Sequence, residues 1–567
     1  MPTRAFDIYD EQVIEAAFLD TRIGCYFVGT YARRVSFASQ QYRSIDLVSA
    51  LDENEPLRGK TVAVIGAGLA GLMAAVEAKR AGAHVHMFEA EAGVLMRQRK
   101  ASHRLIHPTV NRWPWEEIRH STNFHNFDWC ASSCNKIIAN ISAEFDEIHK
   151  PERPAKDATS VGSFTLSLDS RLMAYSRDQS AKYGRIRLNN PPTWLTKVNF
   201  DYAIVANGYG LENPNARADS VPYWVDDEVL QLRDKAARDP EFADQRFFVT
   251  GCGDGGLVDL LRLIHRDFKS GWLTVVVAAA LEKTWIAEAI ARAERDAMMW
   301  ARSILARKPR ELREAYESSE IVQKLQKTYE QCAEILNNET FEGPHAEKYR
   351  YVRELLNASL SEYDLQDRIF LVSPLDQPYA PYSAPIHKLL IAHAKAGSHF
   401  TYGKGGYMEP KDGKPPYVAI GSKGEFFPGP RVKVIPRHGP ETIADSLIEP
   451  EELQSLRLRQ IMLADRVDPT RSRGEAHSSK SKLKAKPLSV RKPHVQAMLD
   501  ELDNRFDVDF TNKGFSYTTV REGDADPECA ASLGDEVIAL KLPDNLFGIK
   551  QIQVPSDLTT MPMLGDD

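Results

Sequence analysis

The clearest pattern in the chain is a short β-rich apolar run, TVAVIG at residues 61–66, that leads directly into the glycine-rich turn GAGLAG. Residues 72–83 continue with apolar side chains at helical spacing and end in Ala-Gly-Ala. HVHMFEA, residues 84–90, then has the composition of a second strand. A strand, a glycine turn, a helix and a strand within about 30 residues form the unit from which doubly wound parallel sheets are built.

The same order of elements recurs near the middle of the chain. RFFVT at 246–250 predicts a strand, GCGDGG follows it, and residues 257–268 have apolar side chains at helical spacing. The run LTVVVAAA at 273–280 predicts the next strand, and DYAIVANGYG at 201–210 is an apolar run that breaks at two glycines. The chain therefore contains two predicted units of one kind, and we find no other internal repeat.

The segments around these units have different patterns. Residues 1–58 read as helical with a basic, aromatic centre, and the pattern leaves open whether this arm packs on the next domain or closes over a cofactor. FTLSLD (164–169) and GRIRLNN (184–190) are suited to antiparallel strands. The remaining predictions are inserted helices at 284–358, a Ser/Lys-rich flexible linker at 471–487, a helix at 488–503, and strands that include EVIALKLP.

Length and composition exclude several classes of protein. A chain of 567 residues exceeds the ~250–300 residues at which one core stops growing, so it has several domains. With 72 basic and 79 acidic residues the net charge is -7, which gives no general attraction for nucleic acid or anionic lipid. The longest apolar run is about half of the ~20 residues that a membrane helix needs. The N-terminus lacks the apolar core of a secretory signal, and six cysteines make no disulfide framework, so we expect a cytoplasmic protein.

The first glycine turn has the residues of a dinucleotide site. In such a turn the first glycine allows the tight bend, the second lets the backbone approach a pyrophosphate, and the third lets helix and strand pack closely. The helix N-terminus then offers free N–H groups to the phosphates. Glu89, at the end of the next strand, is near the offset expected for a carboxylate that binds ribose hydroxyls. The candidate residues are Gly66, Ala67, Gly68, Leu69, Ala70, Gly71 and Glu89.

The segment VAVIGAGLAGLMAAVEAKRAGAHVHMFEA resembles the FAD-binding signature of flavoproteins with two dinucleotide domains, a group that includes glutathione-reductase-like enzymes, flavin monooxygenases and amine oxidases. The resemblance implies that the glycines of 66–71 hold the FAD pyrophosphate and that Glu89 holds the adenosine ribose. DYAIVANGYG resembles the second signature of the group, at the crossover between its two domains, and adds Asn207 and Gly208 as cofactor-binding candidates.

The second glycine turn lies where the resemblance places a nicotinamide-nucleotide domain. Its candidates are Gly251, Gly253, Asp254 and Gly256. The strand predicted at 273–280 offers no acid or arginine at its tip, so the choice between NADH and NADPH stays open. The alternative is a degenerate unit kept for its fold, with Asp254 capping the helix. The aspartate that usually closes the FAD site has no counterpart, because Gly534-Asp535 precedes a strand, and Cys130 and Cys134 are read as two thiols rather than a redox pair.

The predicted fold class is α/β, with a Rossmann-like FAD-binding domain, a second Rossmann-like domain, a helical insertion and a small α+β C-terminal module. The predicted boundaries are 1–58 for the N-terminal helical arm, 59–245 for the FAD-binding domain, 246–445 for the second domain with its insertion 284–358, 446–487 for a helix and flexible linker, and 488–567 for the C-terminal module.

Candidate reacting groups lie in the loop after Glu89, where Gln98, Arg104 and His107 offer hydrogen-bond donors, a cation and an imidazole. A cation near a flavin would favour its reduced anionic form. The alternative is a surface loop that packs on the N-terminal arm. His438 follows a strand and could act as a base, although a single histidine is more often structural. No metal-binding or serine-nucleophile motif is present in the sequence.

The sequence thus predicts an FAD-dependent oxidoreductase that NAD(P)H reduces and that acts on a small organic substrate or on oxygen. A monooxygenase is preferred because ANGYG resembles the Ala-Thr-Gly-Tyr turn of N-hydroxylating enzymes, with Asn207 in place of Thr. The alternatives are an oxidase of amines or amino acids that uses FAD alone, and a non-catalytic nucleotide sensor or defence component. A second copy or a protein partner would bind through the helical insertion and the C-terminal module.

Overall fold

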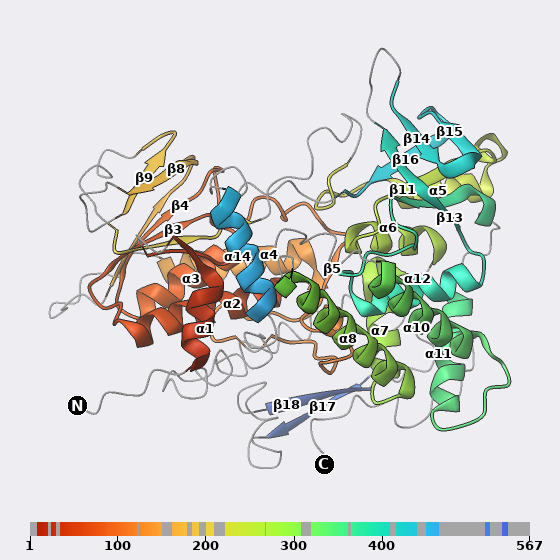
Figure 1. Ribbon diagram of the computed structural model, residues 1–567, viewed down its shortest axis with the longest axis horizontal. Coiled ribbons are helices and arrows are strands. Elements are labelled where there is room, and N and C mark those ends of the chain that lie inside the picture. Colours follow the sequence, from red (N-terminus) through yellow and green to blue (C-terminus); the bar gives the residue numbers. More distant parts are fainter. Residues whose placement is uncertain are drawn as a thin grey trace.

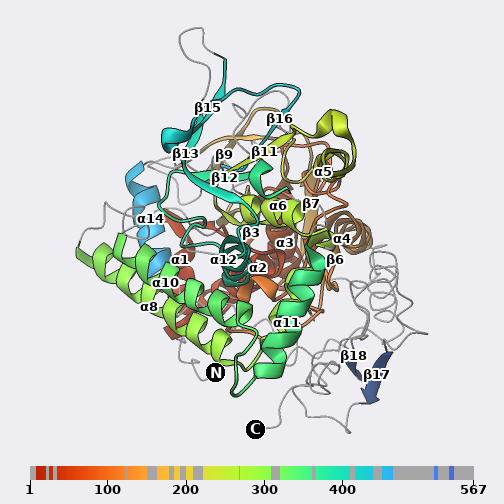
Figure 2. The same ribbon diagram turned by 90° about the vertical axis from the view of Figure 1, so that its right-hand side faces the viewer.

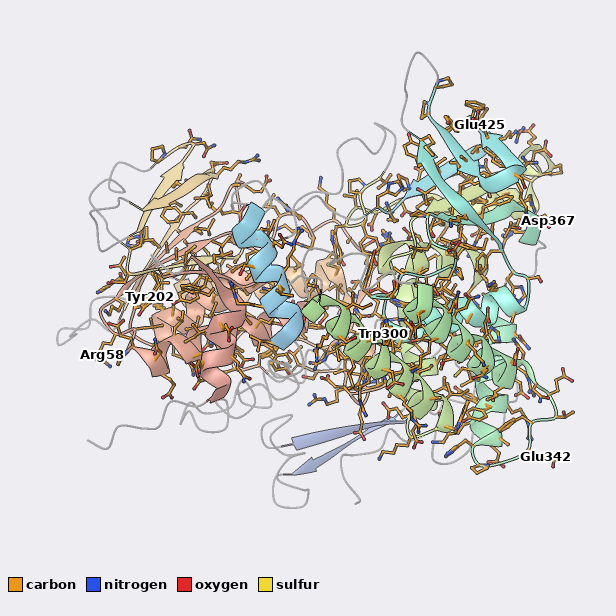
Figure 3. The ribbon with its side chains drawn as sticks, in the orientation of Figure 1. Arg58, Tyr202, Trp300, Glu342, Asp367 and Glu425 are labelled. Carbon is orange, nitrogen blue, oxygen red and sulfur yellow. The ribbon has the colours of Figure 1, made fainter. Side chains whose placement is uncertain are left out.

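The computed structural model describes residues 8–20, 24–29, 35–122, 124–149, 162–177, 184–191, 200–208, 221–266, 268–307, 319–360, 365–408, 415–438, 450–463, 516–521 and 536–541. Two α/β units lie side by side, the first in red to yellow and the second in green to cyan (Figure 1). The predicted α/β class is therefore confirmed. Side chains fill both units, with Tyr202 on the first and Asp367 and Glu425 on the second (Figure 3).

The first unit is built on a six-stranded sheet in the order β1-β2-β10-β3-β4-β7. All neighbours in it are parallel except β1, which pairs with β2 antiparallel. The strands are β1 (Phe18–Asp20), β2 (Cys25–Phe27), β10 (Tyr202–Val205), β3 (Thr61–Ile65), β4 (His84–Phe88) and β7 (Ser163–Ser167). The prediction that FTLSLD forms an antiparallel strand is wrong, because the chain reaches β7 through the crossover helix α4 (Cys134–His149), which returns it in the parallel direction.

Helices cover both faces of this sheet. Val62, Val64 and Val85 point to the face that carries α2 (Phe37–Asn54) and α3 (Leu69–Arg80), as the alternation of side chains along a strand requires. On the opposite face Ala63 and Ile65 share a cluster with Leu456 of α14 (Pro450–Leu463). After the second unit the chain therefore returns to pack on the first. The predicted N-terminal helices are α1 (Ile8–Ala17) and α2, and two short strands between them were missed. β8 (Leu172–Arg177) and β9 (Gly184–Leu188) pair antiparallel, which confirms the prediction for GRIRLNN.

The second unit has a six-stranded sheet in the order β15-β14-β13-β12-β11-β16. The four neighbouring strands β13, β12, β11 and β16 are parallel to one another. The strands are β11 (Arg246–Thr250), β12 (Ile369–Ser373), β13 (Thr401–Met408), β14 (Tyr417–Ile420), β15 (Gly424–Phe426) and β16 (Val432–Pro436). Helix α12 (Pro385–Ala396) connects β12 to β13, and helix α6 (Asp254–Ile264) follows β11 and packs beside β11 and β12.

The run LTVVVAAA is not a strand but lies in helix α7 (Trp272–Ala280), so that prediction is wrong. Eight of the nine residues of α7 are buried, and a segment that is apolar on every side has no periodicity that would distinguish a helix from a strand. Besides β16, the strand that pairs with β11 is β12, about 120 positions further along the chain, after three helices predicted correctly within 284–358. They are α8 (Trp285–Arg307), α10 (Ser319–Asn337) and α11 (Ala346–Ser359), and they lie below the second sheet in Figure 2.

Beyond α14 the structure describes only the hairpin of β17 (Ser516–Arg521) and β18 (Glu536–Lys541), so the strand predicted at EVIALKLP is confirmed. The linker at 471–487 and the helix at 488–503 lie outside the described residues. Within the part of the chain that is described, no helix has the length and apolar character to cross a membrane.

Candidate dinucleotide-binding cleft

The two glycine turns have the same geometry. Gly66 follows β3 with φ 103° and Gly251 follows β11 with φ 108°. A Cβ at Gly66 would lie 2.5 Å from the carbonyl oxygen of Ala206, and one at Gly251 would lie 2.2 Å from that of Arg437. Both turns therefore require glycine at their first position, for the backbone angle and for the close approach of a neighbouring strand end.

The third glycine of each turn brings the helix against the turn. A Cβ at Gly71 would lie 1.9 Å from the Gly66 carbonyl oxygen, and one at Gly256 would lie 2.0 Å from that of Gly251. No side chain fits at either distance. The geometry is the one expected from the sequence for the third position of both turns.

The middle glycine of each turn is open on the side where a ligand would lie. Gly68 is the N-cap of α3, and no atom lies within 4 Å of a Cβ built on it. Gly253 is the N-cap of α6, where the nearest atom is a ring carbon of Tyr382 at 3.8 Å. Neither cap has a side chain that satisfies the first N–H groups of its helix. Two helix N-termini therefore offer donors and a positive dipole end to open space.

Both turns line one cavity of about 1290 Å³. This volume exceeds the ~300–1,000 Å³ of an ordinary small-molecule pocket. From the first unit the cavity is lined by Gly68, Leu69, Ala70, Gln98, Arg104, His107, Asn111 and Gly208, and from the second by Gly251, Gly253, Asp254, Lys404, Arg437 and His438. The residues around the middle glycine of the first turn and Gly251, Gly253 and Asp254 of the second thus come together in a single cleft between the units. The other predicted residues of the two motifs do not line it: Gly66, Ala67, Gly71 and Gly256.

Glu89 holds the first turn. One oxygen of its carboxylate accepts a hydrogen bond from the backbone N–H of Ala67 at 2.5 Å, and the other accepts from that of Glu91 at 2.9 Å. Glu89 does not itself line the cavity. A carboxylate has about four acceptor positions, so Glu89 can bind the turn and still accept from a ligand hydroxyl.

Asn207 is the second residue after the end of β10 and lies beside the first turn, where Gly66 approaches its Cα. Both polar atoms of its amide are buried, and within the described part of the chain neither has a hydrogen-bond partner. Gly208, the next residue, lines the cavity with φ 69°. A buried amide without partners is costly, which marks this turn as a place where a bound group would satisfy polar atoms.

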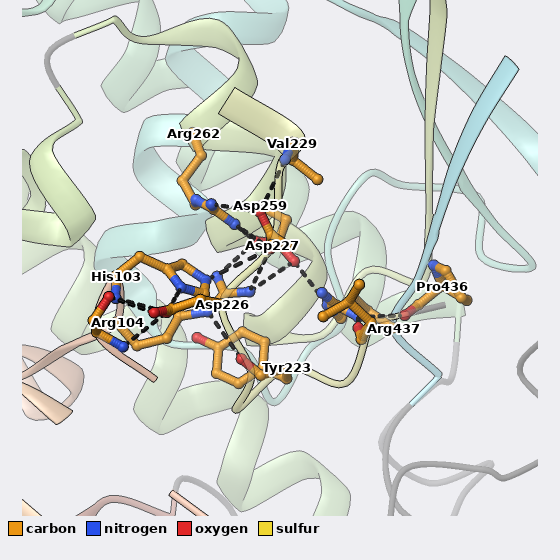
Figure 4. Close-up of polar contacts among 12 residues, drawn as sticks. His103, Arg104, Tyr223, Asp226, Asp227, Val229, Asp259, Arg262, Pro436 and Arg437 are labelled. Atoms are coloured by element: carbon orange, nitrogen blue, oxygen red, sulfur yellow. Dashed lines mark hydrogen bonds and ion pairs between the residues drawn. The ribbon is translucent and has the colours of Figure 1, made fainter. Parts of the chain in front are cut away.

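Arg104 lines the cavity, but its charge is already paired (Figure 4). Its guanidinium donates to both carboxylate oxygens of Asp259 on α6, at 2.6 and 3.2 Å, and to the carbonyl of Tyr223 at 3.1 Å. The guanidinium carbon lies 3.9 Å from the centre of the Tyr223 ring. Arg104 therefore links the first unit to the second, and its charge is neutralised by Asp259 rather than directed toward a flavin.

Asp259 is the centre of this network. It is fully buried and also accepts hydrogen bonds from Arg262 and Arg437, each at 2.7 Å. Burial alone would raise the pKa of Asp259, but the guanidiniums of Arg104, Arg437 and Arg262 outweigh burial and hold that pKa well below its usual range. The sequence analysis did not single out Asp259, although an acid and an arginine three residues apart in the apolar stretch LVDLLRLI could have pointed to it.

His107 lines the cavity as a fixed, neutral imidazole. Its Nδ1 accepts hydrogen bonds from the backbone N–H groups of Thr109 and Val110, so its Nε2 carries the proton and donates to Nδ1 of His120 at 3.1 Å. Burial and the neighbouring His120 lower the pKa of His107 well below its usual value, and burial lowers that of His120 to about 4. In each of the two rings the Nδ1 lone pair, which is the one that could accept a proton, already accepts a hydrogen bond. The arrangement is therefore structural.

Asp254 and His438 both line the cavity near the second turn and have different partners. One carboxylate oxygen of Asp254 accepts from the Ala384 N–H and from Nδ1 of His387, both at 2.8 Å. It therefore caps the start of α12, not its own helix as in the alternative of a degenerate unit, because the segment before α12 packs against the turn. His438 lines the cavity with its Nε2 2.8 Å from the hydroxyl of Thr250.

The N-terminal arm packs on the first unit and also reaches the cavity. Gln41 is fully buried, donates to the carbonyl of Phe127 and accepts from the Trp129 indole N–H. One turn before it, Val35, Ser36, Phe37 and Gln40 line the cavity. The arm thus packs on the first unit, which was one of the two alternatives, and it also forms part of the cavity wall; that it closes over a cofactor stays a prediction. The four lining residues were missing from the predicted site.

Residues 61–199 match the family model DAO, described as FAD dependent oxidoreductase. This segment includes the first glycine turn, Glu89 and the loop that carries Arg104 and His107. The chain carries an FAD-dependent oxidoreductase domain. The match agrees with the resemblance that the sequence showed, and it ends before the second glycine turn.

Solved structures with some likeness to the chain include the bacillithiol disulfide reductase Bdr (YpdA) from Staphylococcus aureus, at 9% identity and TM-score 0.32, covering 70% of this chain and 80% of that one. A complex of OTEMO with FAD and NADP (form 1) is 12% identical with TM-score 0.31, covering 68% of this chain and 72% of that one. TM-scores of this size support no conclusion about this chain. A search of curated protein sequences found no match.

Proposed function

We propose that the FAD-dependent oxidoreductase domain acts with the second unit as an NAD(P)H-dependent flavoenzyme. FAD binds at the first glycine turn, NAD(P)H binds at the second, and a small organic substrate or oxygen takes up the electrons, as in a monooxygenase. The observation that carries this proposal is the single cavity lined by both turns. Two separate pockets would give a hydride no direct path from one nucleotide to the other.

The residues at the first turn fit FAD. The open side of Gly68 at the N-terminus of α3 leaves room and donors for a pyrophosphate. Glu89 lies against the same turn with acceptor positions for ribose hydroxyls, and the unsatisfied amide of Asn207 lies beside it. When bound, FAD supplies the hydride and oxygen chemistry of the reaction, for which the protein provides binding, orientation and electrostatics.

The residues at the second turn fit the pyrophosphate of a nicotinamide nucleotide in the same way. Gly253 is open at the N-terminus of α6, and Tyr382 and His387 line the cavity beside it. Much of the cavity wall is apolar and includes Leu105, Val110 and Phe268. These side chains exclude water from the place where two planar ring systems would meet.

The experiment that tests this proposal is anaerobic mixing of the FAD-loaded protein with NADH or NADPH, with flavin absorbance followed over time. We expect rapid bleaching in the parent protein. Gly253→Val should abolish the bleaching while the FAD content stays unchanged, because a side chain there takes the space of the second pyrophosphate. Bleaching by an amine or amino acid but not by NAD(P)H would instead identify an oxidase. A flavin that is reduced by none of these compounds would favour the non-catalytic sensor.

A further inference from the structure

The register of the two sheets shows which residue of the second unit takes the place of Glu89. The Gly66 N–H donates to the carbonyl of Phe88, the last residue of β4, at 2.7 Å. The Gly251 N–H donates to the carbonyl of Val372 in β12 at 2.9 Å. Since the two turns join their neighbouring strands at equivalent residues, the residue that follows Val372 is the counterpart of the one that follows Phe88. Ser373 therefore stands where the first unit has Glu89.

Ser373 cannot do what a carboxylate does at this position. It is 1% exposed, its hydroxyl lies 2.9 Å from that of Tyr402, and it accepts from the Leu375 N–H at 3.3 Å. The first acidic residue after Ser373 is Asp376, which is not among the residues that line the cavity. The ribose end of the second site thus lacks the acceptor that favours a free 2′-hydroxyl.

A cation lies beside Ser373 instead. Lys404 of β13 is the residue in register with Ser373 of β12, and it lines the cavity. Two described segments form this part of the wall, residues 372–375 and 404–408. Within them, Lys404 is the charged residue that lines the cavity. Its ammonium lies 2.6 Å from a carboxylate oxygen of Asp376, and both side chains are more than half exposed.

We propose that Lys404 binds the 2′-phosphate of NADPH, so that the second site selects NADPH over NADH. This inference rests on the proposed function. NADH offers a diol, for which a carboxylate is the fitting partner, whereas the 2′-phosphate of NADPH needs a cation. An exposed ion pair contributes little, so the phosphate can displace Asp376 from Lys404 at low cost.

Binding of two small probes tests the inference without turnover. Isothermal titration of the FAD-loaded protein with 2′,5′-ADP and with 5′-AMP compares a nucleotide that has the 2′-phosphate with one that lacks it. We expect the parent to bind 2′,5′-ADP more tightly. Lys404→Met should weaken 2′,5′-ADP by about ten- to a hundredfold, the loss of a charge-assisted bond, and leave 5′-AMP unchanged.

Two further variants sharpen the test. Asp376→Asn should strengthen binding of 2′,5′-ADP and not of 5′-AMP, because it frees Lys404 and removes a charge that repels the phosphate. Lys423→Met is the matched control, an exposed lysine of the same unit outside the cavity lining, and should change neither affinity.

The outcomes separate this inference from the proposed function. Tighter binding of 5′-AMP than of 2′,5′-ADP by the parent, or equal weakening of both probes by Lys404→Met, would overturn the role of Lys404 and leave a nicotinamide site in place. Binding of neither probe, together with no flavin reduction by either nicotinamide, would overturn the proposed function and this inference with it.

Discussion

Replacing Arg104 by methionine tests the buried contact that joins the two units. The guanidinium is 1% exposed and donates two hydrogen bonds to Asp259 and one to the carbonyl of Tyr223. Methionine keeps much of the length and removes the charge and the donors. Loss of one partner of a buried ion pair costs about 3–5 kcal/mol. Because Asp259 keeps Arg262 and Arg437, we expect a cost near the lower end, about 3 kcal/mol.

Neutralising the other partner of the ion pair, by Asp259→Asn, should cost more stability than Arg104→Met. Asp259→Asn leaves three guanidiniums around a neutral amide, whereas Arg104→Met leaves the carboxylate with two partners. Chemical denaturation of the parent, both variants and the double variant, followed by tryptophan fluorescence, gives the free energies of unfolding and the coupling between the two residues. Arg99→Met, an exposed arginine of the same loop, is the control and should stay within about 0.5 kcal/mol of the parent. An Arg104→Met variant as stable as the parent, or a double variant that is strictly additive, would refute the reasoning.

The pH dependence of the same contact has a definite sign. The pKa of Asp259 is held below its value of about 3.9 in the unfolded chain, because the three guanidiniums outweigh the effect of burial. The ionised carboxylate therefore stabilises the fold above that pH, and the contribution is lost as the pH falls through the lower pKa of the folded state. The difference in stability between the parent and Asp259→Asn should shrink in acid.

The remaining predictions concern the first turn and a partly buried acid, Glu282. Glu89→Ala should weaken FAD about ten- to a hundredfold, measured by equilibrium dialysis against free FAD, through loss of a charge-assisted acceptor; unchanged affinity would leave Glu89 with only the turn to hold. Gly68→Val should lower the FAD content of purified protein at unchanged fold by circular dichroism, and full FAD content would show that the pyrophosphate lies elsewhere. Burial raises the pKa of Glu282 to about 7, so the stability of the parent should fall as pH rises from about 4.5 through 7, by up to about 3 kcal/mol. Glu282→Gln should flatten that dependence in denaturation series at several pH values, and an unchanged slope would contradict it.

The sequence was informative where the chemistry is local. The turn 66–71 has its glycines at the positions that its own backbone angles and contacts require, and Glu89 lies one residue after the strand that the turn contacts. Spacing alone therefore located both features. The second turn was found by the same rule at Gly251, Gly253 and Gly256.

The sequence failed where the determinant is distant along the chain. Helix α7 follows α6 where the next strand was expected and is buried along nearly its whole length, so it was taken for that strand, while β12 lies beyond three inserted helices. That error also hid Ser373 and Lys404, since only the register of β12 and β13 shows that Ser373 corresponds to Glu89 and that Lys404 lies beside it. The pairing of Arg104 with Asp259 spans 155 positions, and no local pattern records it.

The central claim is that one cavity brings FAD and a nicotinamide nucleotide together, and anaerobic titration of the FAD-loaded protein with NADPH tests it most directly. The account predicts that the visible absorbance of the flavin is lost with about one equivalent of NADPH for each FAD, as a two-electron reduction requires. A flavin that stays oxidised in excess NADPH and excess NADH, in protein shown to bind 2′,5′-ADP, would contradict it.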